Sequence, residues 1–329
     1  VTCEMPQTRS VSINIFIGVG SRYEPSEQAG ISHFIEHLVF KGTTRRPTPW
    51  EISATIEGAG GSLNAGTEQE LTVYWCKVPQ RHYKESLDLL IDMLRNSLLE
   101  PEGIEKERMV VIEELNMIND HPSYKVDALI DEMLWPNHPL GRDIGGTKES
   151  VSTMTREMVQ KHMALNYTPS NIVVSVAGNV SHLETIRQLE VLCKGWSSSQ
   201  SLRWIPFTHL QSAPQCRIEY RKTEQTHLSI AVPGVPLEHS DRYAMDLLSV
   251  ILGEGMSSRL FVEVRERRGL AYDIHSSTSH FFDSGALTIS AGVDHKRIYD
   301  AVRTILTELS GLRVDVPEEE LERAKRLST

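Results

Sequence analysis

The sequence is poor in cysteine, in aromatic residues and in basic residues, and it contains no long hydrophobic run. Four cysteines are spread over 329 residues without a CxxC pair, which argues against a disulfide framework and favours reduced thiols in a cytosol-like compartment. The 34 Lys+Arg are outnumbered by 44 Asp+Glu, and a net charge of −10 argues against a nucleic-acid-binding protein, which needs a basic face. The longest apolar run, residues 172–177, has the length of a strand and not of a membrane span.

The composition is that of a globular protein with two domains. Hydrophobic residues make up 40% of the chain and charged residues 24%, which excludes global disorder. A chain of 329 residues exceeds the size at which single cores stop growing. Because the chain begins at Val1 and ends within a Glu/Arg-rich helical pattern, we expect a segment of a longer protein. Its first residues show no secretory signal.

Both halves follow the same order of strand, helix, paired strands and long helices. We therefore predict an α+β fold of two similar units, each a mixed, mostly antiparallel sheet flanked by helices. Residues 195–215 have no sustained period, so we expect domains at 1–200 and 216–329, joined by a linker at 201–215. The expected elements of the first half are strands at 10–18, 62–67, 71–78 and 171–177, a helix from 31, helices at 83–99 and 103–119, and one helix between 146 and 171.

The sharpest local motif is HxxEH, formed by His33, Glu36 and His37 within a helical pattern. At 100° per residue these three side chains share one arc, opposite an apolar arc that would be buried. Neutral imidazoles one turn apart can bind one Zn²⁺, which then needs a further protein ligand and a water. A solvated polar face is the alternative interpretation. The apolar arc consists of Ile31, Phe34, Ile35, Leu38 and Val39.

The later helix at 103–119 offers a third ligand. Glu107 and Glu114 fall inside its apolar stripe, whereas Glu113 falls about 100° away from it. Buried carboxylates are costly unless a metal or a cation compensates them, so Glu114 is the expected ligand and Glu107 the carboxylate that orients an imidazole. Buried salt bridges to Arg or Lys are the alternative. The stripe consists of Ile104, Val110, Val111, Leu115 and Ile118.

Several sequence blocks resemble the pitrilysin-type (insulinase, M16) zinc peptidases, especially the branch of mitochondrial processing peptidase and its bacterial relatives. HxxEH is the signature of this inverzincin type. The blocks are GISHFIEHLVFKGT (30–43), GGSLNAGTEQELTVYWCKV (60–78), ERMVVIEEL (107–115), HPLGRDIGGTKES (138–150), YTPSNIVVSVAGNV (167–180) and SRLFVEVRERRGLAY (258–272). They cover nearly the whole chain, and their order and spacing make the resemblance specific.

The resemblance implies a zinc-dependent metalloendopeptidase that hydrolyses peptide bonds of short or unfolded peptides, with one Zn²⁺ per chain. It implies that His33, His37 and Glu114 bind the metal, at the spacing the family's pattern expects, and that Glu36 is the general base. Glu107 matches the family's supporting carboxylate.

Outside the metal centre, the resemblance implies that Asn64 and Ala65 lie on an edge strand that pairs with the peptide substrate. Arg265 and Tyr272 match an Arg-x6-Tyr pair that the family's non-catalytic half brings to the substrate. From its sequence surroundings alone, Arg265 is one more charge in a solvated helix.

The resemblance also bears on the rest of the molecule. The first domain would be catalytic, and the second would hold substrate and lack the region that usually follows in the family. A homodimer or a heterodimer with a related subunit fits, in the bacterial cytoplasm or the mitochondrial matrix, with no nucleic acid and no membrane span. Two alternatives stay open: an inactive scaffold or regulatory subunit of the same family, and a non-peptidase zinc enzyme such as S-ribosylhomocysteine lyase.

Overall fold

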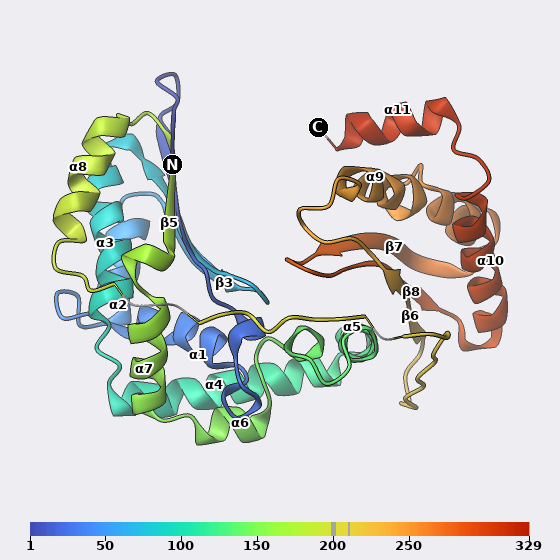
Figure 1. Ribbon diagram of the computed structural model, residues 1–329, viewed down its shortest axis with the longest axis horizontal. Helices are drawn as coiled ribbons and strands as arrows, with labels where there is room; N and C mark the ends of the chain where they lie inside the picture. The colour runs from blue at the N-terminus through green and yellow to red at the C-terminus, as the bar shows by residue number, and fades with distance from the viewer. Residues whose placement is uncertain (199–201, 210, 329) are drawn as a thin grey trace. The chain divides into compact units, whose positions relative to one another are not determined.

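A computed structural model describes residues 1–198, 202–209 and 211–328. The chain forms two compact units (Figure 1). Unit 1 comprises Val1–Asn116 and Arg142–Ile205, and unit 2 comprises Met117–Gly141 and Pro206–Thr329. This division departs from the expected boundaries at 117–141, which fall in unit 2. Residues 201 and 210 of the expected linker lie outside the described residues.

Unit 1 contains a five-stranded sheet in the order β1-β5-β2-β4-β3, in which only the β1–β5 pair is parallel. Strand β2 alternates strictly, with Val11, Ile13, Ile15 and Ile17 fully buried and polar or half-buried residues between them. This period of two fixes which face of the sheet meets the core. The strands are β1 (Thr2–Glu4), β2 (Ser10–Ile17), β3 (Ser62–Thr67), β4 (Thr72–Pro79) and β5 (Ile172–Gly178).

Helices cover this sheet, and Figure 1 shows α3 and α8 along the same face. Helix α3 buries an apolar stripe that includes Leu87, Leu90 and Leu94 in the same core as β2. Helix α4 begins in unit 1 and continues into unit 2 after Asn116. The helices of this part of the chain are α1 (Ile31–Leu38), α2 (Pro49–Glu57), α3 (Tyr83–Asn96), α4 (Pro101–Asp120), α6 (Lys148–Thr153), α7 (Arg156–Asn166) and α8 (His182–Leu192).

The expected elements of the first half are present, but some of their boundaries were wrong. The helix expected at 83–99 ends at Asn96, because the chain turns extended at Ser97 and Leu99 adopts a positive φ of 51°. The single helix expected after residue 146 is two, α6 and α7, and the Thr155 side chain caps the second. Helices α2 and α8 form where no helix was expected.

Unit 2 is built around a three-stranded antiparallel sheet in the order β6-β8-β7. Its strands are β6 (Thr226–Pro233), β7 (Ala271–His280) and β8 (Gly285–Val293). Helix α5 (Pro122–Leu134) packs against β6 and β8, and Trp135 beyond its end donates a hydrogen bond to Ser284 at 2.8 Å. These contacts explain why 117–141 belongs to unit 2. The other helices are α9 (Arg242–Gly253), the π-helical turn η7 (Phe261–Arg267), α10 (Ile298–Gly311) and α11 (Glu318–Leu327).

The two sheets share a design, since the order β6-β8-β7 repeats the order β2-β4-β3, again with helices against the strands. The predicted fold class, α+β with mixed and mostly antiparallel sheets flanked by helices, is confirmed. Among the helices that the structure describes, none combines the length and the apolar character needed to cross a membrane.

Burial of His162 on α7 predicts a pH-dependent stability. Burial lowers the pKa of His162 to about 4, and its Nε2 has no hydrogen-bond partner among the described residues. Between pH 4 and 6.5 the unfolded chain therefore binds the extra proton, so stability is complete above pH 6.5 and falls as the pH drops towards 4. The loss amounts to at most about 3 kcal/mol.

His162→Gln should flatten this part of the pH profile when the free energy of unfolding is measured in urea between pH 4.5 and 7. His295→Gln, which changes an exposed histidine of unit 2, is the control and should keep the wild-type slope. A His162→Gln profile parallel to that of wild type would contradict the assignment.

Candidate metal centre

Helix α1 carries two imidazoles and a carboxylate on its half-buried face. His33, Glu36 and His37 occupy this face, and all five residues of the expected apolar arc, Ile31, Phe34, Ile35, Leu38 and Val39, are at most 2% exposed. The predicted helical phase is therefore confirmed. Because the buried face fixes the rotation of the helix, the direction in which the imidazoles point is also fixed.

Helix α4 supplies carboxylates from its own inner face. Glu107 is only 5% exposed, Glu114 is half-buried, and Glu113 is exposed. The predicted apolar stripe was wrong at Val110, which is 50% exposed, because this residue lies on the flank of the buried arc. Arg108, which was not expected there, is buried instead and donates to the carbonyl oxygens at the end of α6.

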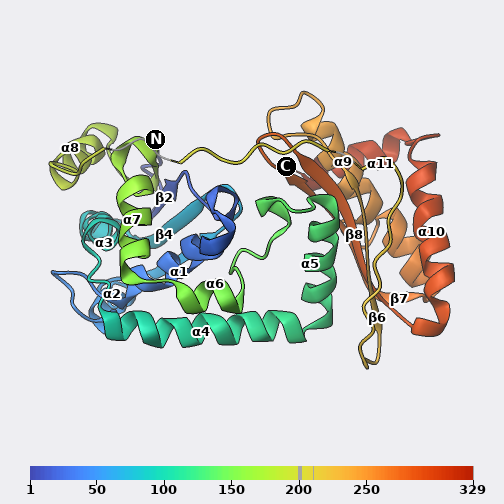
Figure 2. The same cartoon turned by 60° about the horizontal axis from the view of Figure 1, so that its bottom comes forward.

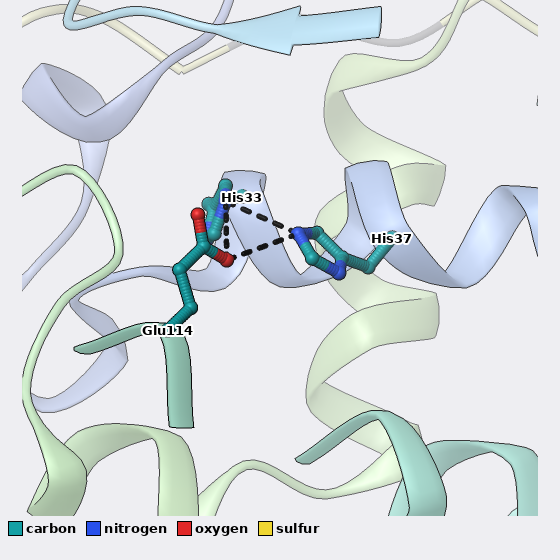
Figure 3. A group of neighbouring side chains, drawn as sticks. All are labelled: His33, His37 and Glu114. Carbon is teal, nitrogen blue, oxygen red and sulfur yellow. Dashed lines mark hydrogen bonds and ion pairs between the residues drawn. The ribbon is translucent and has the colours of Figure 1, made fainter. Parts of the chain in front are cut away.

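The structure brings His33, His37 and Glu114 together (Figure 3). The two Nε2 atoms are 3.2 Å apart, and Glu114 Oε2 lies 3.6 Å from His33 Nε2 and 3.5 Å from His37 Nε2. Four ligands at the usual zinc bond lengths of ~2.0–2.1 Å stand ~3.3 Å from one another in a tetrahedron. The three atoms thus match one face of a zinc tetrahedron, and within the described part of the chain they form the only group suited to a metal ion.

Glu107 contacts the imidazole of His37 on the side away from the metal group. Its Oε1 lies 2.8 Å from His37 Nδ1, and its Oε2 lies 2.6 Å from Lys41 Nζ. With the Nδ1 proton donated to Glu107, the lone pair of Nε2 points to the shared centre with His33 and Glu114. The donor set therefore fits a zinc ion, with the buried carboxylate held by an imidazole on one side and an ammonium on the other.

The electrostatics differ between the two imidazoles. Burial, helped by the neighbouring His37, lowers the pKa of His33 to about 4, so this ring is neutral at pH 7. For His37, burial opposes protonation, but the hydrogen bond to Glu107 and the surrounding carboxylates outweigh burial and raise the pKa. Burial also opposes ionisation of Glu107, yet its bonds to His37 and Lys41 lower the pKa of this carboxyl.

Glu36 lies beside the metal group without belonging to it. Its Oε2 accepts a 2.6 Å hydrogen bond from Thr67 Oγ1, the last residue of β3. Burial, with a smaller contribution from the negative charge of Glu114, raises the pKa of Glu36 against the opposing effect of Thr67. The carboxylate is therefore tied to the edge strand of the sheet, and its burial raises its pKa.

Lys41 and Thr67 were missed in the sequence. Lys41 follows His37 by four residues, which places it one helical turn further along, and that spacing could have suggested the ion pair with Glu107. Thr67 offered no such signal, because its contact with Glu36 arises from the packing of β3 against α1. The sequence pattern of a strand does not show which helix it will touch.

Asn64 and Ala65 lie on β3, opposite Trp75 and Tyr74 of β4. Strand β3 is the last strand of its sheet, so its other edge has no partner strand within the described residues. Asn64 is exposed, and its Oδ1 accepts a hydrogen bond from the Ala65 amide at 2.9 Å.

Arg265 and Tyr272 belong to unit 2 and contact each other. The guanidinium carbon of Arg265 lies 4.8 Å from the centre of the Tyr272 ring and 4.6 Å from that of Phe261. Tyr272 is 76% exposed. Arg265 thus stacks between two rings at the end of η7 and is not one more solvated charge.

Comparisons with known proteins agree on one family. The family model described as "Insulinase (Peptidase family M16)" matches residues 1–148, and the one described as "Peptidase M16 inactive domain" matches 153–328. An uncharacterised zinc protease of Mycobacterium leprae is 38% identical over 96% of this chain and 71% of its own length. YmxG of Bacillus subtilis, also named an uncharacterised zinc protease, is 36% identical over 97% of this chain and 78% of its own.

A solved structure shows the same fold. The crystal structure of a protease from Helicobacter pylori superimposes with a TM-score of 0.90, at 24% identity, over 99% of this chain and 80% of that one. The chain is thus an α+β protein in which the helix of the HxxEH motif and a glutamate of a later helix meet at one place. The chain belongs to peptidase family M16, and the resemblance found in its motifs is confirmed.

We expect substitutions of the two adjacent glutamates of α4 to differ clearly in their effect on zinc affinity. Glu114→Gln should lower zinc affinity by more than the roughly 10–100-fold that follows from loss of a supporting residue, because it removes a ligand. Glu113→Gln should bind zinc as wild type does, since Glu113 is exposed and absent from the metal group. Competition with a chelator measures both affinities, and equal losses would refute the choice of Glu114.

Proposed function

We propose that the chain is a zinc-dependent metalloendopeptidase that hydrolyses peptide bonds of short or unfolded peptides, with one zinc ion per chain. The observation that carries the proposal is the triangle of His33, His37 and Glu114 at tetrahedral spacing, with a separate buried carboxylate, Glu36, on the same helix face. A metal site with three protein ligands leaves one position open for a water, which is the arrangement of a catalytic and not of a structural site.

His33, His37 and Glu114 would hold the zinc ion, which would act as a Lewis acid towards a water and the scissile carbonyl. Glu36 takes a proton from the attacking water and returns it to the leaving amine. Thr67 holds one carboxylate oxygen and leaves the other available for the proton.

The edge of β3 provides a place for the substrate backbone. A peptide in extended conformation can add to this edge by main-chain hydrogen bonds along Asn64 and Ala65. Thr67 on the same strand contacts Glu36, so a peptide paired with β3 runs past the general base. Strand addition requires an extended chain, which favours short or unfolded peptides over folded proteins.

We assign a substrate-holding role to unit 2, in which Arg265 and Tyr272 contact the substrate. Stacking on the Tyr272 ring presents the guanidinium of Arg265 as a hydrogen-bond donor for a peptide carbonyl, and the exposed phenol offers another. We further propose that the chain works as a homodimer or with a related subunit, in the bacterial cytoplasm or the mitochondrial matrix. The role of unit 2, the oligomeric state and the compartment are inferred from the family to which the chain belongs.

An inactive scaffold or regulatory subunit of the same family is the alternative. One family description contains the word "inactive", but it applies to residues 153–328 and not to the half that carries the metal group. An inactive member of the family is expected to lack a ligand or the base. This chain has His33, His37, Glu114 and Glu36 in place. Zinc content measured together with cleavage of a quenched fluorogenic peptide distinguishes the two.

Glu36→Gln tests the general base. The variant should bind one zinc ion per chain with wild-type affinity, because Glu36 is not a ligand, while kcat falls by roughly 10²–10⁴-fold. Glu113→Gln is the matched control and should keep wild-type turnover. Undiminished peptide cleavage by Glu36→Gln would end the assignment.

Arg265→Met tests the role of unit 2. The variant should lower kcat/KM by about tenfold or more through the loss of a charged hydrogen bond to substrate, with zinc content unchanged. Arg267→Met removes a neighbouring guanidinium that is 67% exposed and pairs with Glu263, and it should behave as wild type. Equal kinetics for wild type and both variants would remove Arg265 from the site.

A further inference from the structure

The amino end of α1 is held in an unusual way. Its N-cap residue is Gly30, which has a φ of 91° and no side chain to cap the helix. Glu24, six residues earlier, takes over this role: its Oε2 accepts a 2.7 Å hydrogen bond from the Gly30 amide and its Oε1 a 2.8 Å bond from the Ser32 amide. At 1% exposure, Glu24 is among the most deeply buried carboxylates of the protein.

The two carboxylate oxygens of Glu24 accept hydrogen bonds from the Gly30 and Ser32 amides, and these two bonds fix more than the helix end. Burying a carboxylate is costly, and two hydrogen bonds from backbone amides and the positive end of the helix dipole offset part of this cost, although burial still raises the pKa of Glu24. The buried face fixes the rotation of α1, and the two bonds at its amino end hold its axial position, whereas a single bond would let this end pivot. Ser32 immediately precedes His33, so the anchor acts one residue from the first imidazole.

The chain around Glu24 reinforces the anchor. Arg142 donates to the backbone carbonyl of Glu24 at 2.6 Å, and Ser150 Oγ donates to the Ala29 carbonyl at 2.7 Å. Gly146 lies so close to Ala29 that a Cβ at this position would stand 2.1 Å from the Ala29 oxygen. The segment 142–150 therefore fixes the position of the residues before α1. The two hydrogen bonds of Glu24 then fix the amino end of the helix relative to these residues.

We propose that Glu24 is a positioning residue of the metal centre, which sets the spacing of His33 and His37 to Glu114 by fixing the amino end of α1. This inference rests on the proposed function as a zinc enzyme. Both imidazoles and Glu36 are carried by α1, whereas Glu114 is carried by α4. A shift of α1 by about 1 Å would carry the 3.2–3.6 Å triangle away from tetrahedral spacing.

Glu24→Gln tests this role, because the amide keeps the size of the side chain but turns an NH₂ group towards one of the two helix amides. Asp92→Asn is the matched control: Asp92 is also a fully buried carboxylate of unit 1, and its partners Thr43, Arg45, Arg46 and Asn96 all lie outside α1. Zinc affinity is measured by chelator competition at a temperature at which circular dichroism shows every variant folded. The absorption spectrum of the cobalt-substituted protein reports ligand geometry independently of stability.

Glu24→Gln should bind zinc about 10–100-fold more weakly and alter the cobalt spectrum, whereas Asp92→Asn should lower the melting temperature with affinity and spectrum unchanged. Wild-type affinity and spectrum in a destabilised Glu24→Gln variant would reduce Glu24 to a purely structural role and overturn the proposal.

Should Glu24→Gln fail to fold, Glu24→Asp replaces it. This side chain keeps the charge, but it is one methylene shorter and reaches only one of the two amides, so its zinc affinity should lie below that of wild type. A folded Glu24→Asp variant with wild-type affinity overturns the proposal. No peptide enters these measurements, so they do not depend on peptide cleavage. If the chain binds zinc but cleaves no peptide in a separate assay, the proposed peptidase function is refuted, whereas the role of Glu24 still stands.

Discussion

The metal centre depends on one constraint: two nitrogen atoms from α1 and one oxygen atom from α4 must stand at the edge length of a zinc tetrahedron. Helix α1 alone does not provide this set. His33 and His37 occupy one turn of its half-buried face, and its opposite face is buried in the core. The third atom, from Glu114, comes from α4, whose residues Val111 and Leu115 belong to the same hydrophobic core as the apolar face of α1. Hydrophobic packing therefore brings the two helices together, and in our proposal the Glu24 anchor at the amino end of α1 sets the final spacing.

Carboxylates surround this centre, and each has a different partner that fixes its role. Glu107 lies between an imidazole and the ammonium of Lys41, so its charge is compensated and its position is fixed. Glu36 has a threonine hydroxyl as partner and keeps a raised pKa. Glu24 faces the amides at the start of α1. In our proposals four glutamates, counting Glu114, act as ligand, orienting group, base and helix anchor, according to what each one faces.

The sequence predicted the fold class, and it predicted which helix faces carry His33, His37 and Glu114, because both predictions rest on local periodicity. Alternation in residues 10–17 and the helical phase around His33 follow from the backbone geometry of a single element. Contacts between elements were not predictable in this way: the bond from Thr67 to Glu36, the anchor from Glu24 to Ser32, and the packing of α5 in unit 2 all depend on tertiary structure. The exposure of Val110 has the same cause. A helical wheel gives the angular position of a residue, but the width of the buried arc depends on tertiary packing.

The most direct test of the account is a crystal structure of the chain grown with zinc, with anomalous scattering recorded at the zinc edge. The account predicts one ion per chain, bound by Nε2 of His33, Nε2 of His37 and a carboxylate oxygen of Glu114 at ~2.0–2.2 Å, with Glu36 close by but not ligated. An anomalous peak elsewhere, an ion bound through Glu113, or no ion at this place with zinc in excess would contradict it.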